Sequence, residues 1–341
     1  MPTHSLAVCP DVDPTSTLQF VINAAAGSSE ADAKREVIEA ALHAGGRRGQ
    51  LLFCDPAELP GAAQAAAARA LADRTAVVAV GGDGTINTVA QAAHAQGCAM
   101  GVVPQGTFNY FARTHGIAAD PAEAVQMLLS STPSPVQVAG INDRVFLVNA
   151  SLGLYPDLLE DREAYKARFG RSRWVAFWAG MATLLRAKRQ LRLHIEQGAT
   201  VRDVRALTLF VGNNRLQLAQ LGVEPASRPE SGPADGHITA VVLRPVGTLS
   251  MIGLMLRGAM GTLGEAQSVE HFEFNRMVVK PTLPHGRRGV KVAFDGEVTR
   301  MRAPLDFRVF DKPLFLMKPR RDDADAEGTV DTGHDSEGKG G

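Results

Sequence analysis

Cysteine is scarce in this sequence, and long apolar stretches are absent. The 341 residues contain three cysteines, Cys9, Cys54 and Cys98, which are odd in number and too widely spaced for a zinc cluster. They indicate ordinary thiols, which excludes structural disulfides and structural zinc. The longest apolar stretch, from Trp174 to Leu185, is far shorter than the ~20 residues that a membrane-spanning helix needs. Met1 to Pro14 has no Lys or Arg and resembles no secretory signal, so we expect a cytoplasmic protein that can act at a membrane surface.

Net charge is also absent, since Lys+Arg and Asp+Glu both total 36. The balance hides an asymmetry. Asp322 to Gly341 holds seven acids and one base, which leaves 35 bases, 29 acids and a net charge of +6 in residues 1–321. A modestly basic body is compatible with an anionic partner. Residues 320–341 lack apolar periodicity, and we predict a disordered acidic tail there.

The first 130 residues alternate between short apolar runs and longer Ala-rich patterns. Strand-like runs occur at Leu18–Ile22, Gln50–Cys54, Ala76–Val80 and Ala99–Val103, and helical patterns at Glu30–Ala44, Ala62–Ala72, Ile86–Gln96 and after Pro121. Apolar strands separated by helices are typical of a parallel sheet covered on both faces. The length of the chain suggests two domains. We therefore predict an α/β nucleotide-binding domain with a parallel sheet over residues 17–133.

The pattern changes after Pro133 to many short β-type runs separated by turn residues. These runs are Val136–Ala139, Val145–Ala150, Leu191–Ile195, Ala206–Val211, His237–Leu243, Met277–Val279, Val290–Phe294 and Phe307–Val309. Short strands in series indicate an antiparallel sandwich or barrel. Residues 134–319 are therefore predicted to form a β-rich, sandwich-like domain, interrupted by helical insertions near Tyr165–Arg189 and Thr248–Leu263.

A glycine-rich segment, Gly81-Gly82-Asp83-Gly84-Thr85-Ile86-Asn87, follows the third apolar run and opens a helix. Glycines let a ligand approach the backbone closely, and unpaired N–H groups at a helix start favour phosphate. A Walker A loop is excluded because no lysine is present, and the dinucleotide fingerprint is excluded because Asn87 stands where it needs glycine. A tight turn without a ligand is the alternative. Asp83 is expected to act on the phosphates through magnesium or to brace the loop.

A second loop, Pro104-Gln105-Gly106-Thr107-Phe108-Asn109-Tyr110-Phe111-Ala112-Arg113, follows the next apolar run. The first run ends at Asn23-Ala24-Ala25-Ala26-Gly27. In open α/β sheets ligands bind beyond the carboxyl ends of the strands. The three loops are therefore predicted to converge on one site.

Together these segments resemble the diacylglycerol kinase catalytic domain, and the soluble bacterial lipid kinases in particular. The motifs are Gly-Gly-Asp-Gly-Thr at residues 81–85, Pro-x-Gly-Thr-x-Asn-x-Phe-Ala-Arg at 104–113, Phe146 to Gly153, Ala234 to Ile238 and Phe294-Asp295-Gly296-Glu297. The resemblance covers roughly residues 17–318.

The resemblance implies that ATP and a lipid hydroxyl meet between the two domains, with Mg²⁺ as cofactor. It implies nucleotide contacts by Asn23, Gly27, Gly81, Gly82, Gly84, Thr85, Asn87, Gly106, Thr107 and Asn109. Glu297 matches the family's proton acceptor, with Asp295 as its neighbour and Asp83 in the loop, so these three acids are the catalytic candidates. Asp235 is the metal candidate. The sequence departs from the family at three places. Ala24–Ala26 replaces a polar or proline-containing stretch, Tyr110 stands where an aspartate is common, and Gly232 stands where an acid is common.

Each acid also has a simpler explanation. Asp295-Gly296 is typical of a β-turn with solvated acids, and Asp235-Gly236 of a turn that precedes a strand.

Asp161 to Arg192 contains nine basic residues, two acids and an aromatic stripe, which suits either docking on an anionic bilayer or core packing with a basic face. Nucleic-acid binding is not expected because no recognised module accompanies this patch.

The leading hypothesis is an ATP-dependent lipid kinase, a phosphotransferase with an alcohol acceptor such as diacylglycerol. An NAD kinase is an alternative because that family shares Gly-Gly-Asp-Gly-Thr. A regulator that binds nucleotide or lipid without turnover is a third, since fold alone does not fix function. The sequence does not identify the lipid or the oligomeric state.

Overall fold

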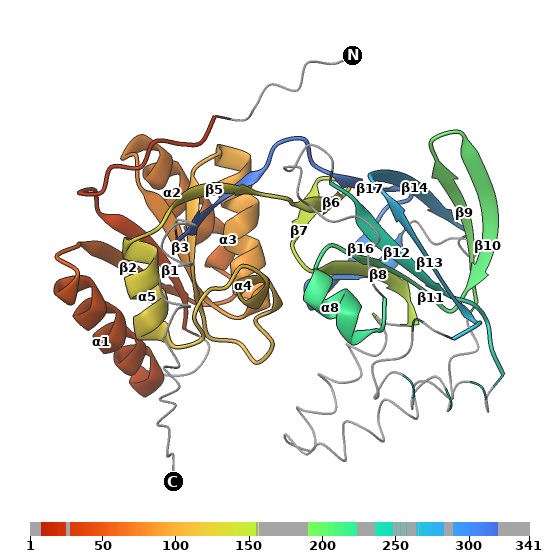
Figure 1. Cartoon of the computed structure of the whole chain (residues 1–341), viewed down its shortest axis with the longest axis horizontal. Coiled ribbons are helices and arrows are strands. Elements are labelled where there is room, and N and C mark those ends of the chain that lie inside the picture. Colours follow the sequence, from red (N-terminus) through yellow and green to blue (C-terminus); the bar gives the residue numbers. More distant parts are fainter. Residues whose placement is uncertain are drawn as a thin grey trace, which may run out of the picture.

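The computed structural model describes residues 8–24, 28–154, 156, 190–223, 236–247, 250, 253, 257, 264, 266–282 and 289–319. Within these ranges an α/β domain lies beside a β-rich domain (Figure 1). The predicted fold class is therefore confirmed. The helical insertions expected at Tyr165–Arg189 and Thr248–Leu263 lie wholly or mostly outside the described residues, as does the tail. None of the described helices is both long and apolar enough to cross a membrane.

The first domain is built on a six-stranded sheet in the order β2-β1-β3-β4-β18-β5. Its strands are β1 (Leu18–Asn23), β2 (Gly49–Cys54), β3 (Ala76–Gly81), β4 (Ala99–Pro104), β5 (Thr132–Val136) and β18 (Leu314–Lys318). All run parallel except β5, which is antiparallel to β18. β3 and β4 are buried at every residue, as befits strands with helices on both faces.

Five helices accompany this sheet: α1 (Ser28–Ala44), α2 (Leu59–Ala72), α3 (Asp83–Gln96), α4 (Tyr110–Thr114) and α5 (Pro121–Leu129). α2 packs on α3, and α1 packs on α5. The chain steps from β1 to β2 in one direction and from β2 to β3 in the other, so right-handed crossovers put α1 and α2 on opposite faces. The direction reverses between β1 and β3. Ligands bind at such a reversal, beyond the carboxyl ends of the strands.

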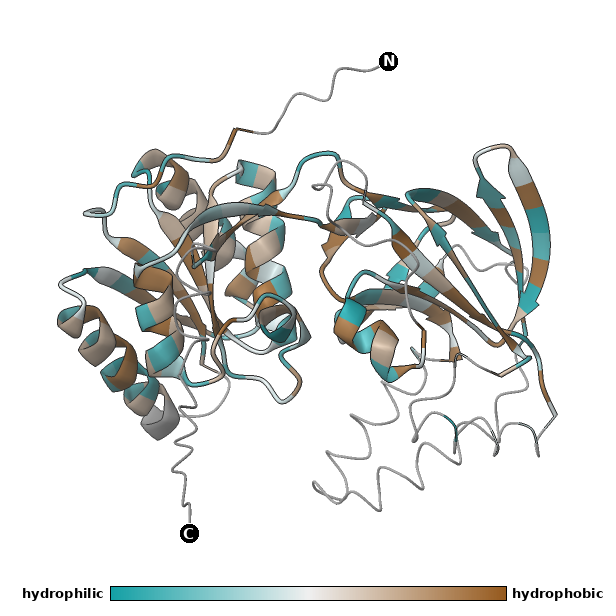
Figure 2. Ribbon diagram, in the orientation of Figure 1, coloured by the Kyte–Doolittle hydropathy of each residue, from teal (hydrophilic) through white to brown (hydrophobic). Residues whose placement is uncertain are grey.

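The second domain consists of two antiparallel sheets in the orders β10-β9-β14-β17-β6-β7 and β13-β12-β11-β8-β15-β16. Its elements are β6 (Ala139–Ile141), β7 (Arg144–Phe146), β8 (Asn149–Gly153), β9 (Leu191–Gln197), β10 (Thr200–Ala206), β11 (Thr208–Gly212), α8 (Arg215–Gln220), β12 (Ile238–Leu243), β13 (Val269–Phe274), β14 (Arg276–Pro281), β15 (Val290–Phe294), β16 (Glu297–Met301) and β17 (Leu305–Val309). One core joins the sheets, with Phe146 and Phe307 from the first and Leu152 and Phe294 from the second. Apolar and polar residues alternate along many of these strands (Figure 2).

The domain boundary differs from the one expected at residue 133. β5 and β18 both belong to the first sheet, so residues 314–318 lie in the α/β domain, although the sequence placed them in the β-rich one. The strand expected at Val136–Ala139 is divided, because β5 ends at Val136 and β6 begins at Ala139 in the other domain. The boundary was misplaced because the chain enters the second domain after β5 and returns to the first domain at β18. The apolar run of β18 is suited to either core and does not show by itself to which domain it belongs.

The position of β18 predicts a large effect for Leu316→Ala. Leu316 is fully buried in the core of the first domain, so truncation should lower the free energy of unfolding by about 2–5 kcal/mol. Leu52→Ala, the same change at a side chain that is 41% exposed on β2, is the control and should cost less than about 1 kcal/mol. Urea denaturation measures both values. Equal losses would contradict this placement of β18.

Candidate functional site

The carboxyl ends of β1 and β3 carry the first cluster of predicted site residues. Asn23 ends β1 and its Nδ2 donates a hydrogen bond to Thr85 Oγ1 at 3.3 Å, which links the two strand ends across the reversal point. Gly82 caps the 14-residue helix α3 without a side-chain hydrogen bond. The first N–H groups of a helix have no partners within it, and its dipole favours an anion there. This end of the sheet is therefore suited to phosphate. Gly27 lies outside the described residues.

The two glycine loops touch one another through their glycines. The Gln105 N–H donates to Gly81 O at 2.8 Å. A Cβ atom on Gly106 would lie 2.7 Å from the Cα of Gly82, and one on Gly82 would lie 3.3 Å from the Cα of Gly106. Because the obstructing atoms are backbone atoms, a side chain at Gly106 would force the loops apart. Glycine is required here by close approach.

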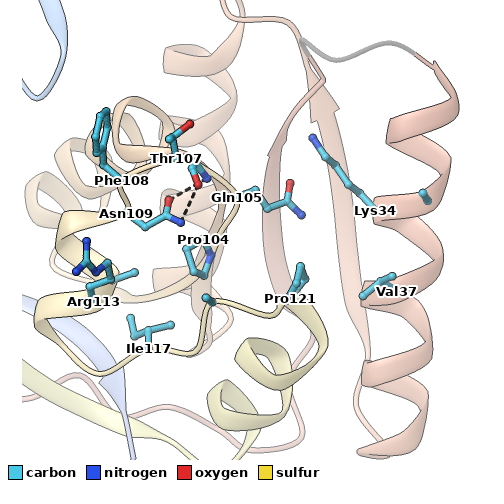
Figure 3. A pocket seen from close by; sticks show the side chains of 14 residues that line it. Lys34, Val37, Pro104, Gln105, Thr107, Phe108, Asn109, Arg113, Ile117 and Pro121 are labelled. Carbon is cyan, nitrogen blue, oxygen red and sulfur yellow. Dashed lines mark hydrogen bonds between the residues drawn. The ribbon is translucent and has the colours of Figure 1, made fainter. Parts of the chain in front are cut away.

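Asn109 shapes the second loop from within. Its Oδ1 accepts from the N–H of Gly106 at 2.8 Å and its Nδ2 donates to the carbonyl of Gly106 at 2.9 Å. The residue has a φ of +50°, a conformation that asparagine tolerates better than most residues. Both polar atoms of the Asn109 side chain therefore form hydrogen bonds within the loop. Thr107, in contrast, is exposed and its side chain is directed outward (Figure 3).

Asp83, the first residue of α3, is turned toward α4. Burial raises the pKa of its carboxyl, and the backbone N–H groups of residues 109–111 act in the opposite direction. These groups stand at the start of α4. Its Oδ1 is buried and accepts no hydrogen bond from the described residues. No group of three potential metal ligands occurs in the described ranges, and Asp235 lies outside them.

Asp295 is the most constrained acid of the site. It is 5% exposed and accepts four hydrogen bonds, from the N–H groups of Leu147, Val148 and Asn149 and from Asn87 Nδ2, at 2.6–2.9 Å. Burial raises its pKa to about 6, although each of these hydrogen bonds lowers it. With φ values of +44° and +88°, Asp295 and Gly296 make the two-residue turn between β15 and β16. The expected Asp-Gly turn is present, but its acid is buried and not solvated.

Asn87 joins the two domains. It lies on α3, and its Nδ2 donates both to Asp295 Oδ2 at 2.6 Å and to the carbonyl of Val145 at 3.0 Å. One turn further along, Gln91 Oε1 accepts from the N–H of Val145 at 2.7 Å. Helix α3 is therefore fixed to β7 by two amide side chains. The side chain of Asn87 faces this junction, although the sequence had assigned it to the nucleotide.

Glu297 begins β16 directly after the turn, and it faces the glycine-rich loop. A Cβ atom on Gly84 would lie 3.6 Å from Glu297 Oε1, so the carboxylate stands beside the first turn of α3. The residue is exposed, but neighbouring protein atoms desolvate its carboxylate and raise its pKa, while the charge of Arg144 lowers it. A carboxylate with a raised pKa beside a loop that suits phosphate is suited to accept a proton.

A second contact between the domains involves α4 and α8. Asn214 is 2% exposed, caps α8 through Gln217 N, and donates from Nδ2 to the carbonyl of Tyr110 at 3.1 Å and to Thr114 Oγ1 at 2.8 Å. The hydroxyl of Tyr110 donates to Gln220 Oε1 at 2.8 Å. Tyr110 departs from the family pattern, and its hydroxyl here binds the second domain.

Most of the predicted residues that the structure describes fall into two groups. Asn23, Gly81, Gly82, Gly84, Thr85 and Glu297 gather at the start of α3. Asn87, Asn109 and Asp295 form hydrogen bonds with other parts of the protein through their side chains. Gln91 and Asn214 were missed: Asn214 has a helix-cap signal in the sequence, but its contact with α4 depends on the tertiary fold. The basic segment Asp161–Arg192 lies outside the described residues except for its last positions.

Comparison with known proteins agrees with the resemblance that the motifs indicated. Residues 17–141 match the family model of the diacylglycerol kinase catalytic domain. A Klebsiella pneumoniae (strain 342) protein named as a YegS-like lipid kinase is 38% identical over 98 residues, which are 28% of this chain and only 33% of that protein.

A Staphylococcus aureus (strain MRSA252) protein, also classed by name as a lipid kinase, is 25% identical over 250 residues, or 70% of this chain and 75% of its own. A crystal structure from Bacillus anthracis, classed as a diacylglycerol kinase, superposes with a TM-score of 0.66 and 19% identity over 89% of this chain and 97% of that one. At that identity the likeness concerns the fold.

The buried Asp295 network predicts a pH-dependent cost for Asn87→Ala. Loss of a hydrogen bond to the buried carboxylate should lower the free energy of unfolding by about 1.5–3 kcal/mol. The folded-state pKa of Asp295 is already raised to about 6, and losing a donor raises it further. The cost should therefore be largest at alkaline pH, where the carboxylate is charged in both proteins, and should shrink as the pH falls toward about 6.

Denaturant melts at pH 8 and pH 5 measure this difference. Gln50→Ala, on the edge strand β2, serves as a control with a small loss at both pH values. A cost for Asn87→Ala that does not change with pH would show that the amide does not act on the carboxylate.

Proposed function

We propose that the protein is an ATP-dependent lipid kinase, which transfers the γ-phosphoryl group to a hydroxyl of a lipid such as diacylglycerol. The observation that carries the proposal is the position of Glu297 beside Gly84. Some 200 residues separate the two in the chain, yet a potential proton acceptor faces a helix start that suits phosphate. The names of the Klebsiella, Staphylococcus and Bacillus proteins also support a lipid acceptor.

In the proposed reaction the lipid hydroxyl oxygen attacks the γ-phosphorus. The new O–P bond forms as the bond to the β–γ bridging oxygen breaks, ADP leaves, and the hydroxyl proton passes to Glu297. The loop Gly81–Thr85 and the N–H groups of α3 would hold the phosphates and stabilise the charge of the transition state. Asp295 orients Glu297 by fixing the turn, without contact to the substrate.

Magnesium enters this proposal as part of the MgATP substrate. Mg²⁺ is commonly held by nucleotide phosphates and only one or two carboxylates, so the lack of a three-ligand group in the described ranges is compatible with it. The lipid would be presented at a membrane surface.

The direct test is incubation of the purified protein with labelled MgATP and a lipid panel. Diacylglycerol, phosphatidylglycerol and a sphingoid base are the acceptors, with NAD as a control. Label in a lipid supports the proposal. Transfer to NAD alone would indicate an NAD kinase, and nucleotide binding without transfer would indicate a regulator.

Gly106→Ala should weaken nucleotide binding. The added methyl group would lie 2.7 Å from the Cα of Gly82, which pushes the phosphate loop out of place, and we expect about a tenfold or greater rise in the Kd for MgATP. Gly61→Ala is the matched control, because no atom lies within 4 Å of its Cβ position on α2. Calorimetric titration measures both. Unchanged affinity in a folded Gly106→Ala protein would remove the second loop from the nucleotide site.

Glu297→Gln should lower turnover by about 10²–10⁴-fold, the usual contribution of a general base. The change keeps the size of the side chain but removes the basic oxygen, and MgATP affinity should change little. Wild-type kcat/KM should fall at acidic pH as Glu297 becomes protonated, at a pH above the usual range of a glutamate because its pKa is raised.

The acid limb of this pH profile should be absent in Glu297→Gln. Asp295→Asn is the comparison, because Asp295 acts through the turn and its loss should reduce stability along with turnover. A stable Glu297→Gln protein with most of its turnover would contradict the assignment.

A further inference from the structure

Arg144 is a charged residue at the junction of the domains to which the proposed reaction gives no role. It follows the two-residue turn between β6 and β7, and it is paired with Ile141, a residue of the core between the two sheets of the second domain. Residues directly opposite each other in an antiparallel pair lie on the same face of a sheet. The side chain of Arg144 therefore lies on the inner face of its sheet, where the end of the strand leaves it exposed.

Glu297 occupies the equivalent place in the other sheet. It follows the two-residue turn between β15 and β16, and it is paired with Phe294 of the same core. Sheets that pack face to face lie about 10 Å apart, a gap that an arginine and a glutamate side chain can bridge together. Both side chains thus project into the space between the sheets.

Helix α3 shows that the two hairpins end at the same place. Asn87 Nδ2 donates to the carbonyl of Val145 at 3.0 Å and to Asp295 Oδ2 at 2.6 Å. Arg144 is one residue from the first acceptor, and Glu297 is two residues from the second. Burial raises the pKa of Glu297 and the charge of Arg144 lowers it, so the guanidinium is close enough to act on this carboxylate.

Of the charged residues on the described elements around Glu297, Arg144 is the one whose charge lowers the pKa of this carboxyl. The others are Asp83 on α3, Asp143 before β7, Asp295 in the turn, Lys291 on β15 and Arg300 on β16. The first is turned toward the N–H groups at the start of α4, and the third is bound by those of residues 147–149. The two cations lie opposite each other on the outer face of their sheet, out of phase with its core residues. A change of charge at Arg144 should therefore act on Glu297, whereas one at Arg300 should not.

We propose that Arg144 is a positioning residue of the transfer reaction, whose charge acts across the end of the sandwich and keeps the carboxylate of Glu297 ionised to receive the hydroxyl proton. The inference rests on the proposed function, because it concerns the proton acceptor of that reaction. Without Arg144, desolvation beside α3 would favour the neutral acid, which is no longer a base. One hairpin turn thus carries the base and the other carries the charge that maintains it.

The pH profile of kcat/KM for lipid phosphorylation tests this role. Arg144→Gln should move the acid limb to higher pH, since the pKa of Glu297 rises when the positive charge is lost. Its kcat/KM should be about two- to fivefold below that of the wild type on the acid limb and should match it at alkaline pH. Arg144→Lys keeps the charge and should keep the limb near its wild-type position. Arg300→Gln, the same change at an exposed position on the outer face, is the control and should leave the profile unchanged.

A second measurement does not depend on turnover. In protein labelled at the glutamate carboxyl carbons, NMR titration follows the ionisation of Glu297, whose signal is identified by its absence from Glu297→Gln. The midpoint of this titration should lie at higher pH in Arg144→Gln than in the wild type, and Arg300→Gln should not move it.

A loss of activity in Arg144→Gln that is the same at every pH would overturn the inference, because the guanidinium would then contact the substrate or support the fold. An unchanged midpoint in Arg144→Gln would overturn it as well, while lipid phosphorylation by the wild type would leave the proposed function standing. A wild-type protein that phosphorylates no lipid would instead overturn the proposed function and any catalytic role of Arg144 with it, even if the midpoint moves.

Discussion

The carboxylate of Asp295 is the constraint on which the site depends. Four N–H groups surround it, three from the backbone that leads into β8 and one from α3 of the other domain. A buried charge requires such partners, so the turn between β15 and β16 has one position relative to α3. That turn places Glu297 beside the glycine-rich loop. Glu297 thus lies beside the loop because hydrogen bonds to Asp295, two residues earlier, fix the turn.

From this carboxylate a series of amide side chains continues to the second loop. Asn149 donates from its backbone to Asp295 and from Nδ2 to Gln217, at 2.9 and 3.0 Å. Gln217 in turn lies at the start of α8, which Asn214 caps while it holds the carbonyl of Tyr110. The two loops of the first domain are therefore held against the second domain at two places, at α3 and at α4. Amides serve this purpose because each both donates and accepts.

Much of the fold could be read from the sequence, because the strands of the first domain are continuous apolar runs with helical patterns between them. The strands β1 to β4 lie within one or two residues of their predicted ranges. The strands that were missed, such as β10 and β13, alternate between charged and apolar residues and carry few of the signals of a buried strand. The assignment of β18 to the first sheet depends on a contact between distant parts of the chain, which no local pattern encodes.

The loops of the candidate site could be predicted from the sequence, but the contacts of the individual side chains could not. Strand ends and glycines indicated where the candidate site lies, because parallel strands bring their carboxyl ends to one edge. The roles of Asn87, Asn109 and Asp295 depend on which way each side chain turns, and a motif does not contain that information.

The place of β18 has a consequence for biosynthesis. β18 lies between β4 and β5, so the first domain has an open edge on β4 until residues 314–318 leave the ribosome. At usual rates of translation, about 5–20 residues per second, the interval between Pro104 and Leu314 is roughly 10–40 seconds. During that time β4 presents unpaired backbone groups along an apolar strand. The first domain to be made is thus the last to close, and chaperones would meet it in that state.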